Sequence, residues 1–253
     1  MYRHRRDVAA LLLGVTLLLS WLPLAASEDS DSVGEVVKRA LEAPPNLQLG
    51  KELYRSCAVC HTPEGWGAPS GHYPQIAGQH RSVTLKQLED IHRGNRDNPT
   101  MIPFTSPLFS KGAEALSDVS AYIEQLPMVP NNGTGFGRDL EQGKALYIEY
   151  CQECHGENGE GDAEEFYPRI HGQHYNYIFR QMRWIKMGKR RNSNREMVEQ
   201  VADFTYHDMA IISDYVSRLR PNPEKMATEM DWRNPDFRHE FRTAPRSGEW
   251  RRR

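Results

Sequence analysis

The chain has 253 residues, of which 38% are apolar and 26% are charged. Its formal net charge of −2 at pH 7 excludes the strongly basic face that binding to nucleic acid requires. The length suits two small domains rather than one large one, but so low an apolar content leaves two such cores short of apolar volume.

The first 26 residues have the pattern of a secretory signal peptide. Three arginines within the first six residues precede an almost entirely apolar run over residues 8–22, and small residues up to Ala26 offer a cleavage site. The run is shorter than the roughly 20 residues of a bilayer-spanning helix, so we expect cleavage, with an uncleaved anchor as the alternative. Removing residues 1–26 takes away three Arg and one Asp and changes the net charge from −2 to −4. The sequence therefore predicts export, in bacteria to the periplasm.

Two predicted helices end in the same five-residue motif. Residues 46–60 and 139–154 carry apolar side chains at helical spacing and lead into Cys57-Ala58-Val59-Cys60-His61 and Cys151-Gln152-Glu153-Cys154-His155. Cys-x-x-Cys-His is the attachment signature of c-type haem. Two thiols one helical turn apart can form thioethers with the two vinyl groups of a porphyrin, and the next histidine can coordinate the iron. The sequence therefore predicts two covalently bound haem c groups, whose porphyrins would supply the missing apolar volume.

Other chemistries of paired cysteines explain less of the pattern. A thioredoxin-like dithiol needs a βαβ context, and strand alternation is absent from the sequence. A structural zinc site needs a further ligand at regular spacing; His72 could serve the first half, but the corresponding position 166 is Phe. Disulfides would suit an oxidising compartment but leave the two histidines unexplained. All four cysteines belong to the two motifs, so none remains as a nucleophile.

The chain is a tandem repeat with an offset of 94 residues, which also relates Tyr73-Pro74 to Tyr167-Pro168 and Gly78-Gln79-His80 to Gly172-Gln173-His174. Between the copies lies a segment rich in Pro, Gly and Asn, which is typical of a linker. Each copy is expected to contain a helix before the motif, a middle helix and a last helix, in an all-α fold. The middle helices are expected over 83–92 and 175–187, and the last ones over 113–126 and 207–219. The expected order is a leader segment (27–45), domain 1 (46–126), a linker (127–138), domain 2 (139–220) and a C-terminal extension (221–253).

A second axial ligand decides what each haem can do, since a methionine or histidine there leaves the iron only electron exchange. In domain 1, Met101 is the one methionine between the motif and the linker, and it comes seven residues after Gly94. In domain 2, Met197 lies in the corresponding loop, nine residues after Gly188. We therefore expect the iron ligands to be His61, Met101, His155 and Met197.

Other side chains could compete for these places. Met209 is the second candidate in domain 2, although its helical stripe of apolar neighbours is typical of a core residue. Met182 and Met187 lie on the predicted middle helix and are expected in the core. His80 and His174 are equivalent in the repeat and could give bis-histidine iron; we expect them instead to be polar residues that open the middle helices.

The repeated segment Tyr-Pro-x-Ile-x-Gly-Gln-His begins at Tyr73 and at Tyr167. Together with the haem motif, the later Gln, the Gly-x-Arg loop, the distal Met and the last helix, it resembles the cytochrome c4 family over about residues 46–220. This resemblance implies two tandem cytochrome c-type domains, each a few helices wrapped around one haem.

The resemblance also implies a role for two prolines. The carbonyl groups of Pro74 and Pro168 would accept the Nδ1–H of the axial histidines and hold their rings for coordination. The family usually has an aromatic residue near the start of the middle helix; Tyr177 fits this pattern, but its counterpart in domain 1 is Val83. Residues 221–253 extend past the usual end of the family.

The extension combines a net charge of +2 with aromatic residues, namely Trp232, Phe237, Phe241 and Trp250. It could be a docking arm for a redox partner or a membrane surface, or a loosely ordered segment that wraps the domains.

The expected function is that of a periplasmic electron carrier in a respiratory chain, with a redox-protein donor and acceptor such as a membrane-bound oxidase or reductase. No catalytic residue is expected. One alternative is a haem enzyme, either a dihaem peroxidase or an enzyme like thiosulfate dehydrogenase; the latter would need a spare cysteine as distal ligand. The other is an electron-transfer subunit bound in a dehydrogenase or oxidase complex, which only the extension favours.

Overall fold

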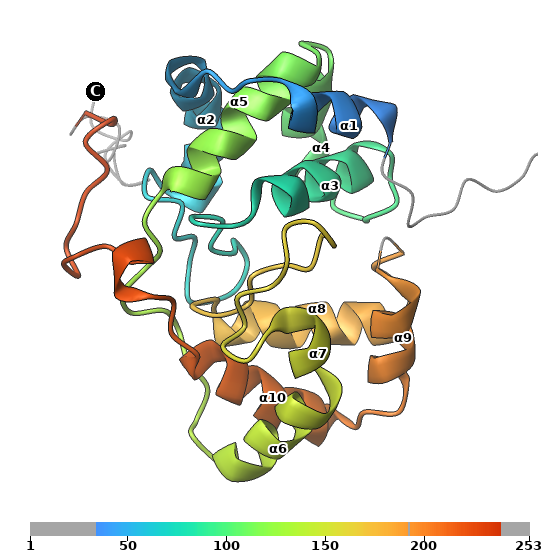
Figure 1. Cartoon of the computed structure of the whole chain (residues 1–253). Helices are drawn as coiled ribbons and strands as arrows, with labels where there is room; N and C mark the ends of the chain where they lie inside the picture. The colour runs from blue at the N-terminus through green and yellow to red at the C-terminus, as the bar shows by residue number, and fades with distance from the viewer. Residues whose placement is uncertain (1–33, 192, 239–253) are drawn as a thin grey trace, which may run out of the picture.

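The computed structural model describes residues 34–191 and 193–238, and the predicted signal peptide and the end of the extension lie outside them (Figure 1). Helices joined by loops make up the described residues, which contain isolated β-bridges but no strand. The prediction of an all-α fold is confirmed. No helix in the described part is long and apolar enough to cross a membrane.

Domain 1, the upper half of Figure 1, is built around two crossing helices, α2 (Leu47–His61) and α5 (Ala113–Gln125). Gly50 lies at their contact, where an added Cβ would come 2.2 Å from the carbonyl oxygen of Asp118, so only glycine allows this approach. Tyr54 and Tyr122 pack together in the core beside the crossing. The helices of this half are α1 (Glu35–Glu42), α2 (Leu47–His61), α3 (Arg81–His92), α4 (Ile102–Phe109) and α5 (Ala113–Gln125).

Domain 2 repeats this plan in the lower half of Figure 1. Gly143 takes the place of Gly50, and a Cβ on it would lie 2.4 Å from the carbonyl oxygen of Ile211. Thr205 and Asp208 form a reciprocal capping box at the start of the last helix. The helices of this half are α6 (Leu140–Tyr150), α7 (Gln152–His155), α8 (Tyr175–Lys186), α9 (Arg195–Ala202) and α10 (Tyr206–Arg218).

Three helices and one break differ from the sequence expectations. Helix α1 lies in the expected leader segment, and its buried Val37 and Ala40 pack on domain 1. Helices α4 and α9 lie in the expected loops. The helix expected over 139–154 is interrupted at Cys151, where φ is −124°, so the second haem motif continues on the short α7.

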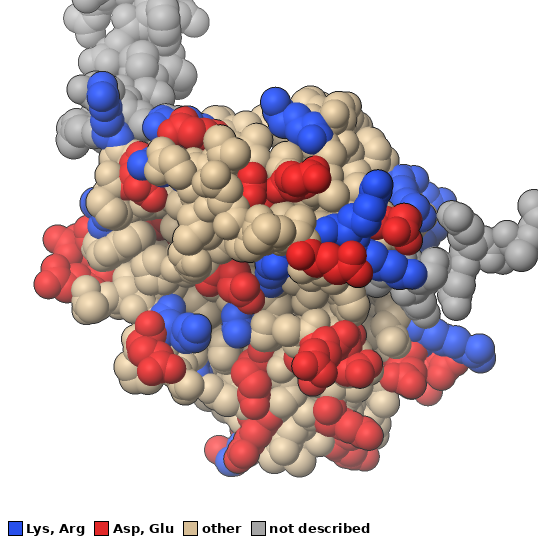
Figure 2. Space-filling view, turned by 45° about the horizontal axis from the view of Figure 1, so that its top comes forward, with Lys and Arg blue, Asp and Glu red and all other residues tan. Residues whose placement is uncertain are grey.

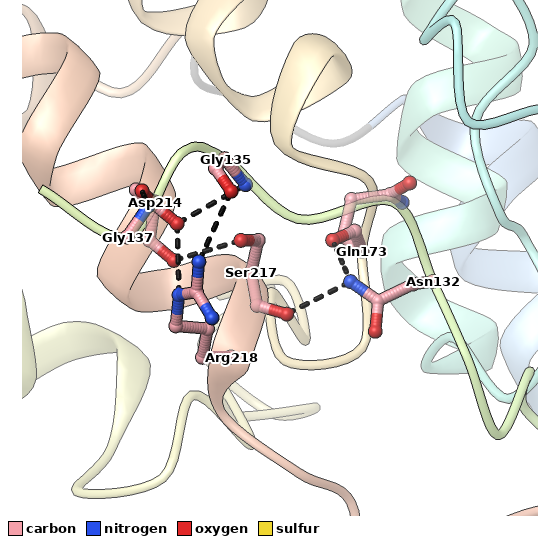
Figure 3. Close-up of polar contacts among 7 residues, drawn as sticks. All are labelled: Asn132, Gly135, Gly137, Gln173, Asp214, Ser217 and Arg218. Carbon is pink, nitrogen blue, oxygen red and sulfur yellow. Dashed lines mark hydrogen bonds and ion pairs between the residues drawn. The ribbon is translucent and has the colours of Figure 1, made fainter.

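The linker is held against domain 2 (Figure 3). The buried carboxylate of Asp214 accepts from the backbone N–H groups of Gly135 (3.1 Å) and Gly137 (2.6 Å), and it also pairs with Arg218 (2.9 Å). Asn132 donates its side-chain amide to the carbonyl of Ser217 at 2.8 Å. Because α10 supplies these partners, residues 132–137 are part of domain 2's surface rather than a free tether.

The described part of the extension leaves domain 2 and returns to domain 1 (Figure 1). After a 3₁₀ turn, η1 (Pro223–Lys225), the chain reaches Asn234, which is buried and donates to the carbonyl of Pro63 at 2.7 Å. Asp236 pairs with Lys51 at 2.9 Å, and the Phe237 ring lies edge-on to Tyr54 at 6.0 Å. Residues 234–237 therefore wrap back onto domain 1 through specific contacts.

Replacing Phe237 by alanine is expected to lower the free energy of unfolding by about 3 kcal/mol, since the ring is 5% exposed and its removal leaves a cavity. Urea denaturation of the haem-loaded protein measures the change. Phe136→Ala is the matched control, because that ring is 89% exposed and its loss should cost under about 0.5 kcal/mol. Equal stability of the two variants would show that the extension does not hold the fold.

Candidate haem sites

One cavity of about 1650 Å³ runs through both domains and is lined by the two haem motifs. It exceeds the range of roughly 300–1,000 Å³ that is typical of a site for one small molecule. Met101 and Met197 also line it, as do Pro74 and Pro168. Met209 does not line it, and its side chain is fully buried in the domain 2 core.

The two motif histidines are held by equivalent hydrogen bonds. Nδ1 of His61 lies 3.0 Å from the carbonyl oxygen of Pro74, and Nδ1 of His155 lies 3.1 Å from that of Pro168. A carbonyl can only accept, so Nδ1 carries the hydrogen and Nε2 is left as the coordinating atom. Burial lowers the pKa of both imidazoles, which favours the neutral form that binds a metal.

Two glycines that sequence reasoning missed bring the proline carbonyls to the histidines. Gly67 and Gly161 have φ of +66° and +67°, in the left-handed region that favours glycine. A Cβ on either would lie within 2.3 Å of the carbonyl oxygen of Tyr73 or Tyr167, respectively. The N–H of Gly67 also donates to the carbonyl of His61 at 2.9 Å. The 94-residue offset relates the two glycines and could have revealed them.

The domains meet through contacts that are equivalent in the repeat. The Nε2 atom of His80 lies 2.9 Å from the carbonyl oxygen of Glu160, and Nε2 of His174 lies 2.7 Å from that of Trp66. His80 corresponds to His174 and Trp66 to Glu160 by the 94-residue offset, so each domain makes the same contact to the other, as in a two-fold interface. Neither histidine lines the cavity, so the structure gives no support to bis-histidine iron. His174 also accepts at Nδ1 from the N–H of Gly133 (3.0 Å), which makes its ring neutral.

Arg96 and Arg190, also equivalent in the repeat, lie side by side where the two halves of the cavity meet. Arg96 donates to the Gln181 amide oxygen and Arg190 to that of Gln87, each at 3.2 Å, so both bonds cross the domain boundary. The pKa of Arg190 is lowered to about 10, mainly by burial and next by the positive charge of Arg96. Tyr177, whose counterpart is valine, accepts from Arg96 at 2.8 Å. Burial opposes ionisation of this phenol, but the two arginines lower its pKa.

The side chains around Arg96 and Arg190 also bear on whether haem groups fit this cavity. Nε of Arg96 and Nε2 of Gln181 are buried and have no hydrogen-bond partner in the protein, and both residues line the cavity. Buried donors without partners are costly and call for an acceptor. A porphyrin of the haem type carries carboxylate side chains that such donors can bind. The cavity, the thiol pairs, the held imidazoles and these donors together fit two haem groups.

Comparison with known proteins agrees with this geometry. Residues 47–127 match the family "Cytochrome c", and residues 138–216 match "Cytochrome C oxidase, cbb3-type, subunit III". Over 179 residues the chain is 30% identical to cytochrome c4 of Azotobacter vinelandii, covering 64% of this chain and 84% of that relative. The chain belongs to the cytochrome c4 family. It therefore carries two covalently bound haem c groups and is a dihaem electron-transfer cytochrome.

Two further likenesses extend the comparison. The crystal structure of reduced cytochrome c4 from Pseudomonas stutzeri superimposes with a TM-score of 0.60 at 25% identity, covering 70% of this chain and all of that one. A protein named "Thiosulfate dehydrogenase electron acceptor" from Stutzerimonas stutzeri (strain A1501) is 29% identical over 157 residues, 58% of this chain and 70% of that relative.

Acidification is expected to weaken the interface of this cytochrome c4. Burial lowers the pKa of His80 and His174, so below the unfolded value of about 6.5 the unfolded chain takes up protons that the folded chain refuses. Above that pH the two histidines make their full contribution to the free energy of unfolding. The contribution declines as the pH falls toward their lowered pKa values in the folded chain.

Urea denaturation of the haem-loaded protein at pH 7 and pH 5 measures this decline. The double variant H80Q/H174Q keeps an N–H donor at each place but cannot titrate, so its stability should fall less between the two pH values. Replacing the exposed His72 by glutamine is the control and should leave the decline unchanged. An equal decline in the double variant and the native chain would contradict this account.

Proposed function

We propose that this cytochrome carries single electrons between redox proteins in the periplasm, as part of a respiratory chain, with each iron held by one histidine and one methionine. The observation that carries this is the placement of Met101 and Met197 in the same cavity as His61 and His155. The haem groups supply the one-electron couple, and a methionine as the second protein ligand would leave no open coordination place and would raise the potential.

The two methionines come from corresponding short helices. Met101 is the N-cap residue of α4, and Met197 lies in the first turn of α9 after the Asn194 cap, whose side chain accepts from its backbone N–H at 3.3 Å. Ordered backbone at both places supports ligands that stay bound. Electron exchange benefits from this rigidity, whereas binding of a substrate to iron would need a ligand that leaves.

A periplasmic location is supported by the predicted signal peptide and by the attachment of haem through Cys-x-x-Cys-His, which bacteria carry out outside the cytoplasmic membrane. The redox partners are donors and acceptors of single electrons. The relative named as an electron acceptor of thiosulfate dehydrogenase supports a dehydrogenase as one class of donor. The alternative of an enzyme like thiosulfate dehydrogenase lacks the spare cysteine it would need as distal ligand, since all four cysteines belong to the haem motifs.

Replacing Met197 by alanine is expected to leave one iron with a free coordination place. The reduced variant should then bind one carbon monoxide per chain, which its optical spectrum reports, and the potential of one haem should fall because the thioether is lost. Met101→Ala should do the same at the other haem.

The matched control is Met209→Ala, which removes the other candidate methionine of domain 2. It should cost about 2–5 kcal/mol of stability, because Met209 is fully buried, but it should bind no carbon monoxide. Carbon monoxide binding by Met209→Ala and none by Met197→Ala would reassign the ligand. Binding by the native protein would overturn the carrier in favour of an enzyme.

A further inference from the structure

We propose that the opening of the haem cavity in domain 2 is the docking surface for a basic redox protein, one that presents lysine and arginine around its own redox group. This inference rests on the electron-transfer function above and names the chemistry of one partner. The corresponding opening in domain 1 lacks the charges that such a partner would recognise.

The two halves of the cavity differ sharply in charge. Seven carboxylate side chains line the domain 2 half, whereas the described residues that line the domain 1 half include no Asp or Glu. Figure 2 shows Asp and Glu gathered over the lower half of the molecule, which is domain 2. Six of the seven carboxylates are exposed, namely Glu149, Glu153, Glu165, Glu196, Glu199 and Asp203.

Comparison of equivalent positions in the two domains shows that domain 2 has carboxylates where domain 1 has uncharged side chains. Glu153, inside the second haem motif, has Val59 as its counterpart, and Glu196, which directly precedes Met197, has Thr100, which directly precedes Met101. Val59 is 70% exposed and Thr100 is also exposed, so neither side chain is needed for a core. The same two places therefore present uncharged side chains in domain 1 and carboxylates in domain 2.

The domain 2 opening also has an apolar centre. The ring of Tyr150 packs edge-on against Phe204 with centroids 5.3 Å apart, which brings the end of α6 beside the end of α9. Glu149 and Asp203 are the chain neighbours of these two rings, and both are exposed. Tyr150 and Val198 are themselves partly exposed. An apolar centre with a charged rim is the usual anatomy of a protein interface.

This arrangement favours a basic protein over other occupants. A single metal ion would need converging ligands, and no group of three or more His, Cys, Asp or Glu in the described residues could hold one. A second copy of this chain would bring the same negative charge to the contact. A basic redox protein is attracted from a distance and guided to Cys151 and Cys154, where the porphyrin edge is attached, and such steering speeds encounter by about 10–10³-fold.

The probe for the test is a basic mitochondrial cytochrome c with zinc in place of iron, so that binding is measured without electron transfer. Isothermal titration calorimetry of the haem-loaded protein at about 10 mM ionic strength should show one probe per chain. The variant E149Q/E153Q/D203N neutralises three of the six exposed carboxylates and should raise the dissociation constant about tenfold, as expected for the loss of three partly screened ion pairs. Binding to the native chain should weaken as salt shortens the Debye length.

The control variant E35Q/E42Q/E114Q makes the same change in net charge on exposed residues of α1 and α5, outside the cavity. It should alter the dissociation constant less than about twofold. Equal weakening in both variants would reduce the effect to net charge and overturn the proposal, as would two probes per chain or an unaffected rim variant. Voltammetry of the same proteins tests electron transfer separately, since two reversible couples should persist whether or not the probe docks.

Discussion

Each domain has to hold one imidazole ring still at the wall of a large cavity, and the hydrogen bond from Nδ1 to a proline carbonyl does this. The rest of the domain serves that bond. Gly67 and Gly161 let the loop approach the end of the motif helix closely, and the hydroxyls of Tyr54 and Tyr147 bind carbonyls just after the motif, at 2.8 and 2.6 Å. A ring fixed in this way would hold its iron-binding nitrogen in one orientation, and such rigidity suits electron transfer.

The second constraint is that two such domains must stay together. Reciprocal contacts of His80 and His174 relate the halves by the repeat itself, and Arg96 and Arg190 meet where the two halves of the cavity join. The linker is bound to α10, and the extension returns from domain 2 to Tyr54 and its neighbours. A chain fastened at three places keeps its two haem motifs in one relative position.

The parts of the fold and of the haem sites that depend on local sequence patterns could be predicted, whereas those that depend on contacts between distant residues could not. The haem motifs and the long helices depend on spacing within a few residues, and the repeat shows as the same short motifs 94 residues apart, so all three could be predicted. Helices α1, α4 and α9 have eight residues each, too short to be stable alone, and α1 owes its form to packing on Leu85 and Leu116. The return of Phe237 to Tyr54 spans most of the chain and leaves no local signal. The partners of Arg96 and Arg190 cross the domain boundary, although the repeated Gly-x-Arg loop marked their positions.

The most direct test of the account is whether both irons are closed to outside ligands. Optical and magnetic circular dichroism spectra of the native oxidised protein, with and without cyanide, answer this in one experiment. Two irons closed by methionine should give a methionine-to-iron band from both haem groups and no change when cyanide is added. Rapid cyanide binding at either haem would contradict this expectation and would identify that haem as a reactive site.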